Sequence, residues 1–195
     1  MISGRDADWD TCRSVLEGHL DWVNAVVFSP NGQLVASASD DSTVRVWETV
    51  TGQCHSVLEG HSGGVSAVVF SPDGQLVASA SYDRTVRVWE TATGQCRSVL
   101  RGQPSSTFRI AFSPDCRTLQ TNKGNISLPS SLIAASAIVQ TEEPLCTTVE
   151  SQWILRQNQR FLWLPPEYRN CVTVVYKGIV CLGCSSGRIA LLCLQ

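Results

Sequence analysis

The sequence has little charge of either sign and lacks any excess of basic residues. Its 195 residues include 15 Lys and Arg against 17 Asp and Glu, which gives a formal net charge of −2. A field this weak and slightly negative cannot hold a nucleic acid or an anionic membrane by general electrostatics. The composition therefore predicts no nucleic-acid partner.

Long hydrophobic runs are also missing. The longest uncharged apolar patch, around residues 132–139, is far too short to cross a bilayer. Residues 1–8 show no basic start followed by an apolar segment, so they do not resemble a signal peptide. We expect no membrane association and a cytoplasmic location, in which the glycosylation motif at Asn125 stays unused.

The nine cysteines are an odd number, and three of them, Cys12, Cys54 and Cys96, are spaced 42 residues apart. This spacing indicates a repeated structural position rather than a disulfide framework, so we expect reduced thiols. Cys181 and Cys184 have the two-residue gap of a zinc knuckle, but a zinc site needs further ligands and the chain has only three histidines. Two buried thiols are favoured, with no metal and no cofactor.

What the sequence does have is an internal repeat. Phe28, Phe70 and Phe112 follow one another at intervals of 42 residues. Residues 12–53 and 54–95 differ at only nine positions. Two copies this similar indicate one structural unit used twice, with a degenerate third copy over 96–128.

Each period predicts a four-stranded antiparallel sheet. Ser29-Pro30-Asn31-Gly32 is typical of a tight hairpin turn, and the β-branched apolar runs around it are typical of strands covered on both faces. In the first period the strands are expected at residues 23–28, 33–38, 43–48 and 53–58.

Gly18-His19, Phe28-Ser-Pro and the run from Val44 to Trp47, all present again over residues 60–90, resemble the WD-repeat family. The resemblance implies an all-β β-propeller that binds other proteins. We expect a partial or small ring of about four to five four-stranded blades, the last ones degenerate. The predicted segments are a flexible N-terminus (1–10) and a propeller domain (11–195), which contains repeats (12–53, 54–95 and 96–128), an insertion (129–144) and a closing blade region (145–195).

The two ends of the chain are expected to meet. Three strand-like runs at residues 171–176, 179–182 and 188–194 lack an outer fourth strand. Residues 11–16 form a strand that precedes any complete repeat. Because an unpaired edge strand seeks a partner, the two ends could pair and close a ring.

Residues 161–169 and 183–188 resemble the C-terminal end of fungal NACHT-type, NLR-like proteins, whose sensor region is a WD-repeat propeller. The resemblance implies a ligand-sensing C-terminal part of a signalling protein. The nucleotide-binding pattern of such proteins, Gly-x-x-x-x-Gly-Lys-Ser/Thr, does not occur in this sequence. Two alternatives stay open: a constitutive scaffold or adaptor in a multiprotein complex, and a truncated fragment without independent function.

Two sets of residues each contain a serine, a histidine and an aspartate, the residue types of a nucleophilic triad. Each set also includes a tryptophan. An enzyme needs one such site, whereas each intact repeat contains a complete set, so the pattern favours a structural role and no catalysis. The resemblance implies hydrogen bonds from Asp to His, His to Ser and Ser to Trp. The two tetrads are His19, Ser37, Asp41 and Trp47, and His61, Ser79, Asp83 and Trp89.

The nine differences between the two repeats are clustered. Six of them lie in two segments: the entry to the first strand and the turn that contains the tetrad aspartate. These two segments should lie on the same rim of the blade if His19 contacts Asp41. A constant scaffold with a varied rim is typical of protein recognition, and drift after duplication is the alternative. The predicted partner-binding residues are Leu20, Asp21, Trp22, Asn24, Asp40, Ser42, Ser62, Tyr82 and Arg84.

Three aromatic residues near the C-terminus allow two interpretations. One interpretation is an aromatic cage for a small ligand, formed by Trp153, Trp163 and Tyr168. The other is that these side chains fill the space between blades. Filling is favoured, so no small-molecule substrate is expected.

Overall fold

A computed structural model of the chain describes residues 12–102, 109–122, 124–129, 132, 147–150, 153–156, 159–164 and 166–193. The predicted all-β class is confirmed, because these residues form eighteen strands and a short 3-10 helix at Pro166–Tyr168. The strands are β1 (Cys12–Leu16), β2 (Val23–Phe28), β3 (Leu34–Ser39), β4 (Val44–Glu48), β5 (Cys54–Leu58), β6 (Val65–Phe70), β7 (Leu76–Ser81), β8 (Thr85–Glu90), β9 (Cys96–Arg101), β10 (Ile110–Phe112), β11 (Thr118–Thr121), β12 (Gly124–Ser127), β13 (Thr147–Glu150), β14 (Trp153–Arg156), β15 (Gln159–Trp163), β16 (Val172–Tyr176), β17 (Ile179–Gly183) and β18 (Ile189–Cys193).

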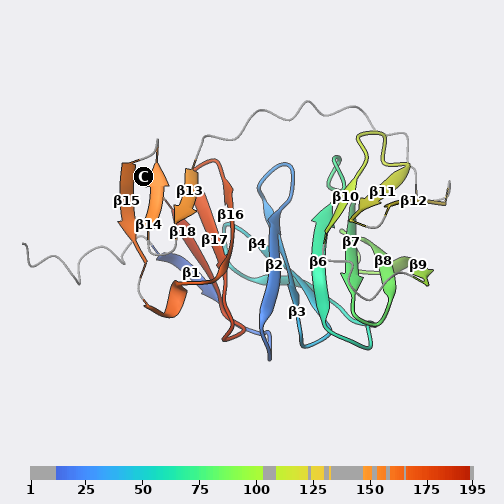
Figure 1. The fold of residues 1–195 in the computed structure, drawn as a ribbon, viewed down its shortest axis with the longest axis horizontal. Helices are drawn as coiled ribbons and strands as arrows, with labels where there is room; N and C mark the ends of the chain where they lie inside the picture. Colours follow the sequence, from blue (N-terminus) through green and yellow to red (C-terminus); the bar gives the residue numbers. More distant parts are fainter. Residues whose placement is uncertain are drawn as a thin grey trace, which may run out of the picture.

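The strands form five antiparallel sheets that stand side by side as blades (Figure 1). Along the row they are sheet E (β13–β15), sheet A (β1 with β16–β18), sheet B (β2–β5), sheet C (β6–β9) and sheet D (β10–β12). Sheets A, B and C have four strands, and sheets D and E have three. The expected four to five blades, the last ones degenerate, are therefore present.

The predicted pairing of the two chain ends is confirmed, but it closes a blade and not a ring. Strand β1 pairs with β18, with Leu16 opposite Ile189, and so supplies the outer strand of sheet A. Sheets D and E lie at opposite ends of the row in Figure 1. The described sheets therefore form the partial arrangement of the two that were expected, because the paired ends lie within the row and its outermost sheets do not meet.

The predicted segments differ in how much the structure describes. Region 145–195, expected to form one closing blade, contributes strands to two sheets, E and A. The degenerate repeat 96–128 likewise supplies the outer strand of sheet C and the three strands of sheet D. Residues 1–10 and all of 129–144 except Pro129 and Leu132 lie outside the described residues.

Within the repeats, the strands begin and end within one residue of the predicted bounds. The turn between β2 and β3 is closed by two backbone hydrogen bonds, from Gly32 N–H to Ser29 O at 2.8 Å and from Ser29 N–H to Leu34 O at 2.9 Å. Gly32 has φ +70°, a backbone conformation that glycine adopts at little cost. Local turn chemistry thus sets the register of the first hairpin.

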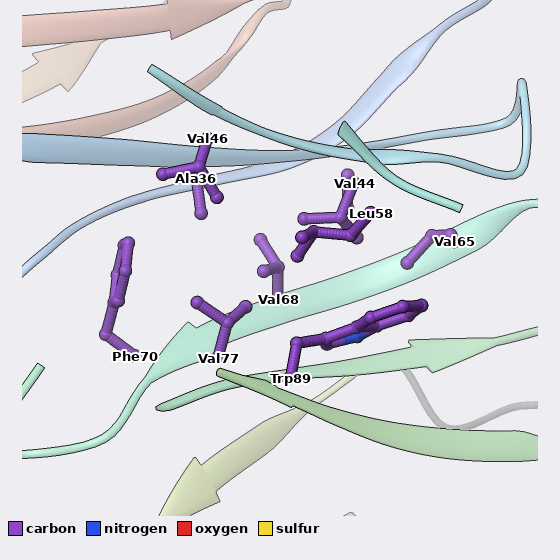
Figure 2. Close-up of a cluster of buried hydrophobic side chains, with 10 residues drawn as sticks. Ala36, Val44, Val46, Leu58, Val65, Val68, Phe70, Val77 and Trp89 are labelled. Atoms are coloured by element: carbon purple, nitrogen blue, oxygen red, sulfur yellow. The ribbon is translucent and has the colours of Figure 1, made fainter. Parts of the chain in front are cut away.

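The core consists of apolar layers between neighbouring sheets. In Figure 2, Val44, Val46 and Leu58 of sheet B face Val77 and Trp89 of sheet C, and all five are buried. Strands β3 and β7, inside sheets B and C, are buried on both faces, which explains why both faces carry small or apolar side chains. Burial of such side chains contributes about 1.5 to 3 kcal/mol each to folding.

The junction between sheets A and B contains an additional clamp. The Tyr176 ring packs against Phe28 with ring centroids 5.6 Å apart, and its hydroxyl donates a hydrogen bond to Pro30 O at 2.9 Å. The ring therefore lies over the turn that contains Gly32. This contact fastens the edge of sheet B to the neighbouring blade.

Two expectations about cysteine are wrong. Cys171 and Cys184 form a disulfide with Cα atoms 4.6 Å apart, so the chain is not fully reduced and Cys184 is not a buried thiol. The pairing follows from the hairpin register: Val172 lies opposite Gly183, which places the two cysteines next to each other just beyond the strands. Cys181 remains a free thiol, and burial raises its pKa.

The described residues contain neither a candidate metal cluster nor a membrane-spanning helix. Within the part of the chain that the structure describes, no group of three or more His, Cys, Asp or Glu side chains could hold a metal ion. Among the same residues, no helix has the length and hydropathy needed to cross a membrane.

Candidate functional site

The structure brings the four residues of the first predicted tetrad into one chain of hydrogen bonds. His19 Nδ1 lies 2.8 Å from Asp41 Oδ2, and His19 Nε2 lies 2.7 Å from Ser37 Oγ. The indole Nε1–H of Trp47 donates to the same Ser37 oxygen at 2.9 Å. Since a carboxylate only accepts, Nδ1 of His19 carries the proton and Nε2 accepts from the Ser37 hydroxyl.

The second repeat contains the same chain with nearly the same dimensions. His61 lies 2.8 Å from both Asp83 Oδ2 and Ser79 Oγ, and Trp89 Nε1–H donates to Ser79 at 2.9 Å. Each network links the segment before the first strand to the turn between the second and third strands. The tetrads therefore tie two segments on the same edge of a blade together.

The geometry is unsuited to nucleophilic catalysis. Ser37 is fully buried, and its oxygen already accepts a hydrogen bond from Trp47 while its proton is directed to His19. A nucleophilic serine needs an open approach for the substrate carbonyl. The arrangement satisfies buried polar groups, which is a structural function.

Each tetrad tryptophan also contacts the preceding blade. Trp47 belongs to an apolar cluster with Ile189 and Leu191 of sheet A, and Trp89 belongs to one with Val44 of sheet B. The tetrad thus fixes the rim of its own blade to the core between blades.

An arginine side chain passes close to the glycine that precedes each tetrad histidine. A Cβ on Gly18 would lie 2.7 Å from Arg45 Nη1, and the Arg45 guanidinium lies 5.9 Å from the Trp47 ring centroid. The second repeat repeats the contact, with Arg87 5.8 Å from the Trp89 ring. A guanidinium stacked on an indole is a favourable cation–π contact.

Burial and hydrogen bonding set the charge states of the tetrads. Burial lowers the pKa of His19 and of His61 and outweighs the neighbouring carboxylates, so both imidazoles are neutral near pH 7. Burial alone would raise the pKa of Asp41, but hydrogen bonds from Thr43, Leu20 N–H and His19 lower it to about 2. The same types of contact hold the pKa of Asp83 below its usual range.

These shifts predict loss of stability in acid. The unfolded chain protonates His19 and His61 near pH 6.5, while the folded chain resists protonation, so the free energy of unfolding should fall as pH drops below about 6.5. A second fall should follow below about pH 3.8, where unfolded Asp41 takes up a proton before folded Asp41 does. Urea unfolding from pH 8 to pH 3 measures both.

An NMR titration of the two imidazoles provides the control. Both should become protonated at a pH below that of an unperturbed histidine. Equal unfolding midpoints at pH 7.5 and pH 5 would contradict the assignment of neutral, buried rings.

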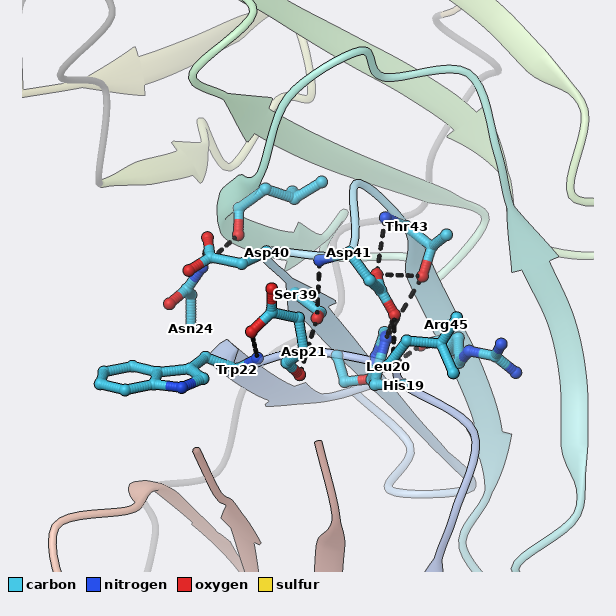
Figure 3. Close-up of polar contacts among 12 residues, drawn as sticks. His19, Leu20, Asp21, Trp22, Asn24, Ser39, Asp40, Asp41, Thr43 and Arg45 are labelled. Atoms are coloured by element: carbon cyan, nitrogen blue, oxygen red, sulfur yellow. Dashed lines mark hydrogen bonds and ion pairs between the residues drawn. The ribbon is translucent and has the colours of Figure 1, made fainter. Parts of the chain in front are cut away.

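Above the tetrads, the predicted binding residues share one edge of sheets B and C. Asp40 N–H donates to Trp22 O at 2.9 Å, and Tyr82 N–H donates to Gly64 O at 3.0 Å, so in each repeat the two variable segments touch. We call residues 20–24, 40–42, 62–66 and 82–84 the variable rim. Figure 3 shows its part on sheet B.

Most of the predicted rim residues are exposed. Leu20 is 90%, Trp22 60% and Tyr82 56% exposed. Asp21, Asp40, Ser62 and Arg84 are also exposed. The structure thus places seven of the nine predicted residues on an accessible surface.

Two of the predicted residues are half-buried and serve the fold. The Asn24 side-chain amide donates to Asp40 Oδ1 at 2.6 Å and to Val65 O at 3.1 Å, which connects sheet B to sheet C. Ser42 occupies a left-handed turn position with φ +69°. Sequence comparison of the repeats did not reveal these roles, because the Asn24 contact reaches into the next blade.

Differences on the opposite edge preserve their contacts. Asn31 Oδ1 accepts from Ser29 Oγ and from Gln33 N–H, and Asp73 Oδ1 accepts from the corresponding Ser71 and Gln75. The exchange of Asn for Asp keeps the accepting oxygen. These positions therefore vary without changing the turn.

One neighbour of the rim was missed. The turn between β17 and β18 lies against it, because Val23 N–H donates to Cys184 O at 3.2 Å and a Cβ on Gly187 would lie 2.6 Å from His19 O. Ser185 and Ser186 of this turn are exposed. The turn lies outside the repeats, so their comparison could not indicate it.

The aromatic residues near the C-terminus are only partly described. The backbones of Trp153 and Trp163 lie opposite each other in β14 and β15, and their side chains lie outside the described residues. Tyr168 packs against the core of sheet A, as the filling interpretation expects.

Comparison with known proteins identifies the repeats. The family model "WD domain, G-beta repeat" matches residues 10–48 and 52–90. Vegetative incompatibility protein HET-E-1 of Podospora anserina is 49% identical over 51 residues, which are 26% of this chain and 4% of that protein.

Two further relatives match shorter segments. Apoptotic protease-activating factor 1 of Danio rerio is 62% identical over 32 residues, 16% of this chain and 2% of that protein. Nuclear distribution protein nudF 2 of Aspergillus clavatus is 49% identical over 43 residues, 20% of this chain and 10% of that protein. The matched segments are thus a small part of each relative.

Proposed function

We propose that this WD-repeat chain, whose residues 10–48 and 52–90 are the matched repeats, binds a partner protein through the variable rim. WD repeats generally act as non-catalytic interaction modules, so the question is which surface binds. The proposal includes a cytoplasmic location, no catalytic activity, and no nucleic acid, membrane or small molecule as ligand.

One observation carries the assignment to the rim: the large apolar side chains Leu20, Trp22 and Tyr82 are all more than half exposed there. Exposed aromatic residues gathered on one surface are typical of protein interfaces, where they act as binding anchors. The tetrads beneath them are the same in both repeats and hold the rim rigidly. A rigid support with variable side chains suits recognition.

Within this role, we propose that the chain is the ligand-sensing part of a fungal NACHT-type signalling protein. The similarity to HET-E-1 and to apoptotic protease-activating factor 1, and the resemblance of residues 161–169 and 183–188, support it. An adaptor in a stable complex is the second candidate. Its support is the similarity to a probable SCF ubiquitin ligase complex subunit, sconB of Arthroderma otae, 50% identical over 44 residues.

Rim substitutions should weaken partner binding without unfolding the chain. Replacing Trp22 by Gly and Arg84 by Ser introduces the residue that the other repeat already carries, and Tyr82→Asp is likewise confined to the surface. Loss of an interface anchor costs about 2 kcal/mol or more, so affinity should fall roughly thirtyfold. Co-purification of the tagged chain from its source cells, followed by titration of the recovered partner, measures this.

The opposite edge provides matched controls. Val50→Ala, Asn31→Asp and Asp73→Asn also exchange the residues of the two repeats, and Val50 is 69% exposed. They should leave the affinity unchanged. Retention of the partner by the rim variants, together with its loss through these controls, would place the binding surface on the other edge.

A further inference from the structure

The part of the rim on sheet B combines an exposed indole with two carboxylates. Asp21 precedes Trp22 in the chain, and Asp40 is hydrogen-bonded through its backbone N–H to Trp22 O at 2.9 Å. In Figure 3 the Trp22 ring extends away from the His19 and Asp41 network, the Asp21 carboxylate lies beside the Trp22 backbone, and the Asp40 carboxylate lies beside Asn24. An exposed indole and two carboxylates thus share one short stretch of the rim.

Neither carboxylate has a cationic partner among the described residues. Asp21 Oδ1 accepts the backbone N–H of Trp22 at 2.8 Å, and Asp40 Oδ1 accepts the Asn24 amide at 2.6 Å. The ion pairs of the described part of the chain involve other acids. The second oxygen of each carboxylate is therefore available to a ligand.

The second repeat shows that the fold does not require this combination. Its counterparts of Asp21, Trp22 and Asp40 are Gly63, Gly64 and Tyr82, yet sheet C has the same four-stranded topology as sheet B. A Cβ on Gly64 would lie 2.5 Å from Asp40 Oδ1 and 3.2 Å from Asp40 Cα, so a side chain there would require Asp40 to shift. The combination of an indole with two carboxylates therefore belongs to the first repeat alone.

The geometry points to an arginine side chain of the partner protein as the occupant, stacked on the Trp22 indole and paired with Asp21 and Asp40. A guanidinium combines both contacts, because its plane stacks on an aromatic ring and its edge donates to carboxylates. The chain already uses this stacking internally, with Arg45 over Trp47 and Arg87 over Trp89. The inference rests on the proposed function and specifies the chemistry of the partner.

A second copy of this chain is the competing occupant. Arg84 is exposed on the neighbouring part of the rim and makes no ion pair with any described residue. In a dimer, Arg84 of one copy could supply the guanidinium that binds Trp22 of the other copy. The molecular mass from light scattering, for the wild-type chain and for Arg84→Ser, decides between a second copy and a partner protein.

The test uses the full chain labelled with 15N and two synthetic peptides, Gly-Ser-Arg-Leu-Arg-Ser-Gly and the same peptide with citrulline in place of both arginines. Citrulline keeps the size of arginine and removes its charge. The indole N–H signal of Trp22 is assigned by its loss in Trp22→Gly. The arginine peptide should shift this signal and bind roughly tenfold more tightly than the citrulline peptide.

Three further measurements complete the test. Asp21→Gly combined with Asp40→Asn should weaken the arginine peptide roughly tenfold, and added salt should weaken it in the wild type. Asp73→Asn, which removes an acid from the opposite edge and installs the residue of the first repeat, should have no effect. Equal binding of the two peptides, or no shift of the Trp22 signal, overturns the inference.

Failure of the arginine inference can be distinguished from failure of the proposed function. If the peptides fail while the natural partner still depends on Trp22, the rim binds protein by other chemistry. If the partner also ignores Trp22, Tyr82 and Arg84, the proposed function fails. A wild-type dimer that Arg84→Ser dissociates makes the occupant a second copy and overturns the assignment to a partner.

Discussion

Replacing Asp41 by Ala should lower the free energy of unfolding by about 3 kcal/mol. The carboxylate accepts hydrogen bonds from His19 Nδ1 at 2.8 Å, Leu20 N–H at 3.0 Å, Thr43 N–H at 2.9 Å and Thr43 Oγ1 at 2.7 Å. Its side chain is only 7% exposed. Truncation leaves these donors without their acceptor, and water replaces the carboxylate only in part.

The matched control is Asp21→Ala, because Asp21 is exposed and, among the described residues, its carboxylate accepts only one hydrogen bond, from the backbone N–H of its neighbour Trp22. This substitution should change stability by less than about 0.5 kcal/mol. Asp83→Ala should match Asp41→Ala, since the second tetrad has the same contacts. Urea unfolding followed by tryptophan fluorescence measures all three, and similar midpoints for Asp41→Ala and Asp21→Ala would show that the tetrad does not support the fold.

The repeated part of the fold could be predicted because its signals are local. The turn at residues 29–32 and the β-branched apolar runs place β2 to β5 within about one residue, and the 42-residue period extends the same bounds to β6 to β9. Tetrad geometry followed from the resemblance, and the shared rim followed from the expected contact between His19 and Asp41. Repetition made each of these signals visible twice.

The rest depends on contacts between distant segments. The disulfide between Cys171 and Cys184 results from the register of one hairpin, and neither cysteine belongs to a repeat. The structural role of Asn24 depends on Val65 O, which the next blade supplies. Whether the row of sheets closes depends on how sheets D and E are placed, and no local pattern encodes that distance.

A junction between blades should likewise respond to a single methyl group. Gly32→Ala should lower the free energy of unfolding by about 3 to 4 kcal/mol. Of this, about 1 to 2 kcal/mol comes from placing a Cβ at φ +70°. The remainder comes from overlap of the new methyl group with the Tyr176 ring, since overpacking costs about 1 to 3 kcal/mol. The ring cannot move freely, because its stacking on Phe28 and its hydrogen bond to Pro30 O hold it.

Gly74→Ala separates these two costs. Gly74 occupies the same turn of the second repeat with φ +73°, but the nearest atom to its added Cβ is Pro30 Cδ at 3.6 Å. Only the backbone cost of about 1 to 2 kcal/mol should remain. In a Tyr176→Leu background, Gly32→Ala should approach the value for Gly74→Ala, because the smaller side chain makes room; a double-mutant cycle of urea midpoints measures this coupling. Equal costs for the two glycines in the wild type would mean that Tyr176 does not cover the turn, and the clamp between sheets A and B would then be wrong.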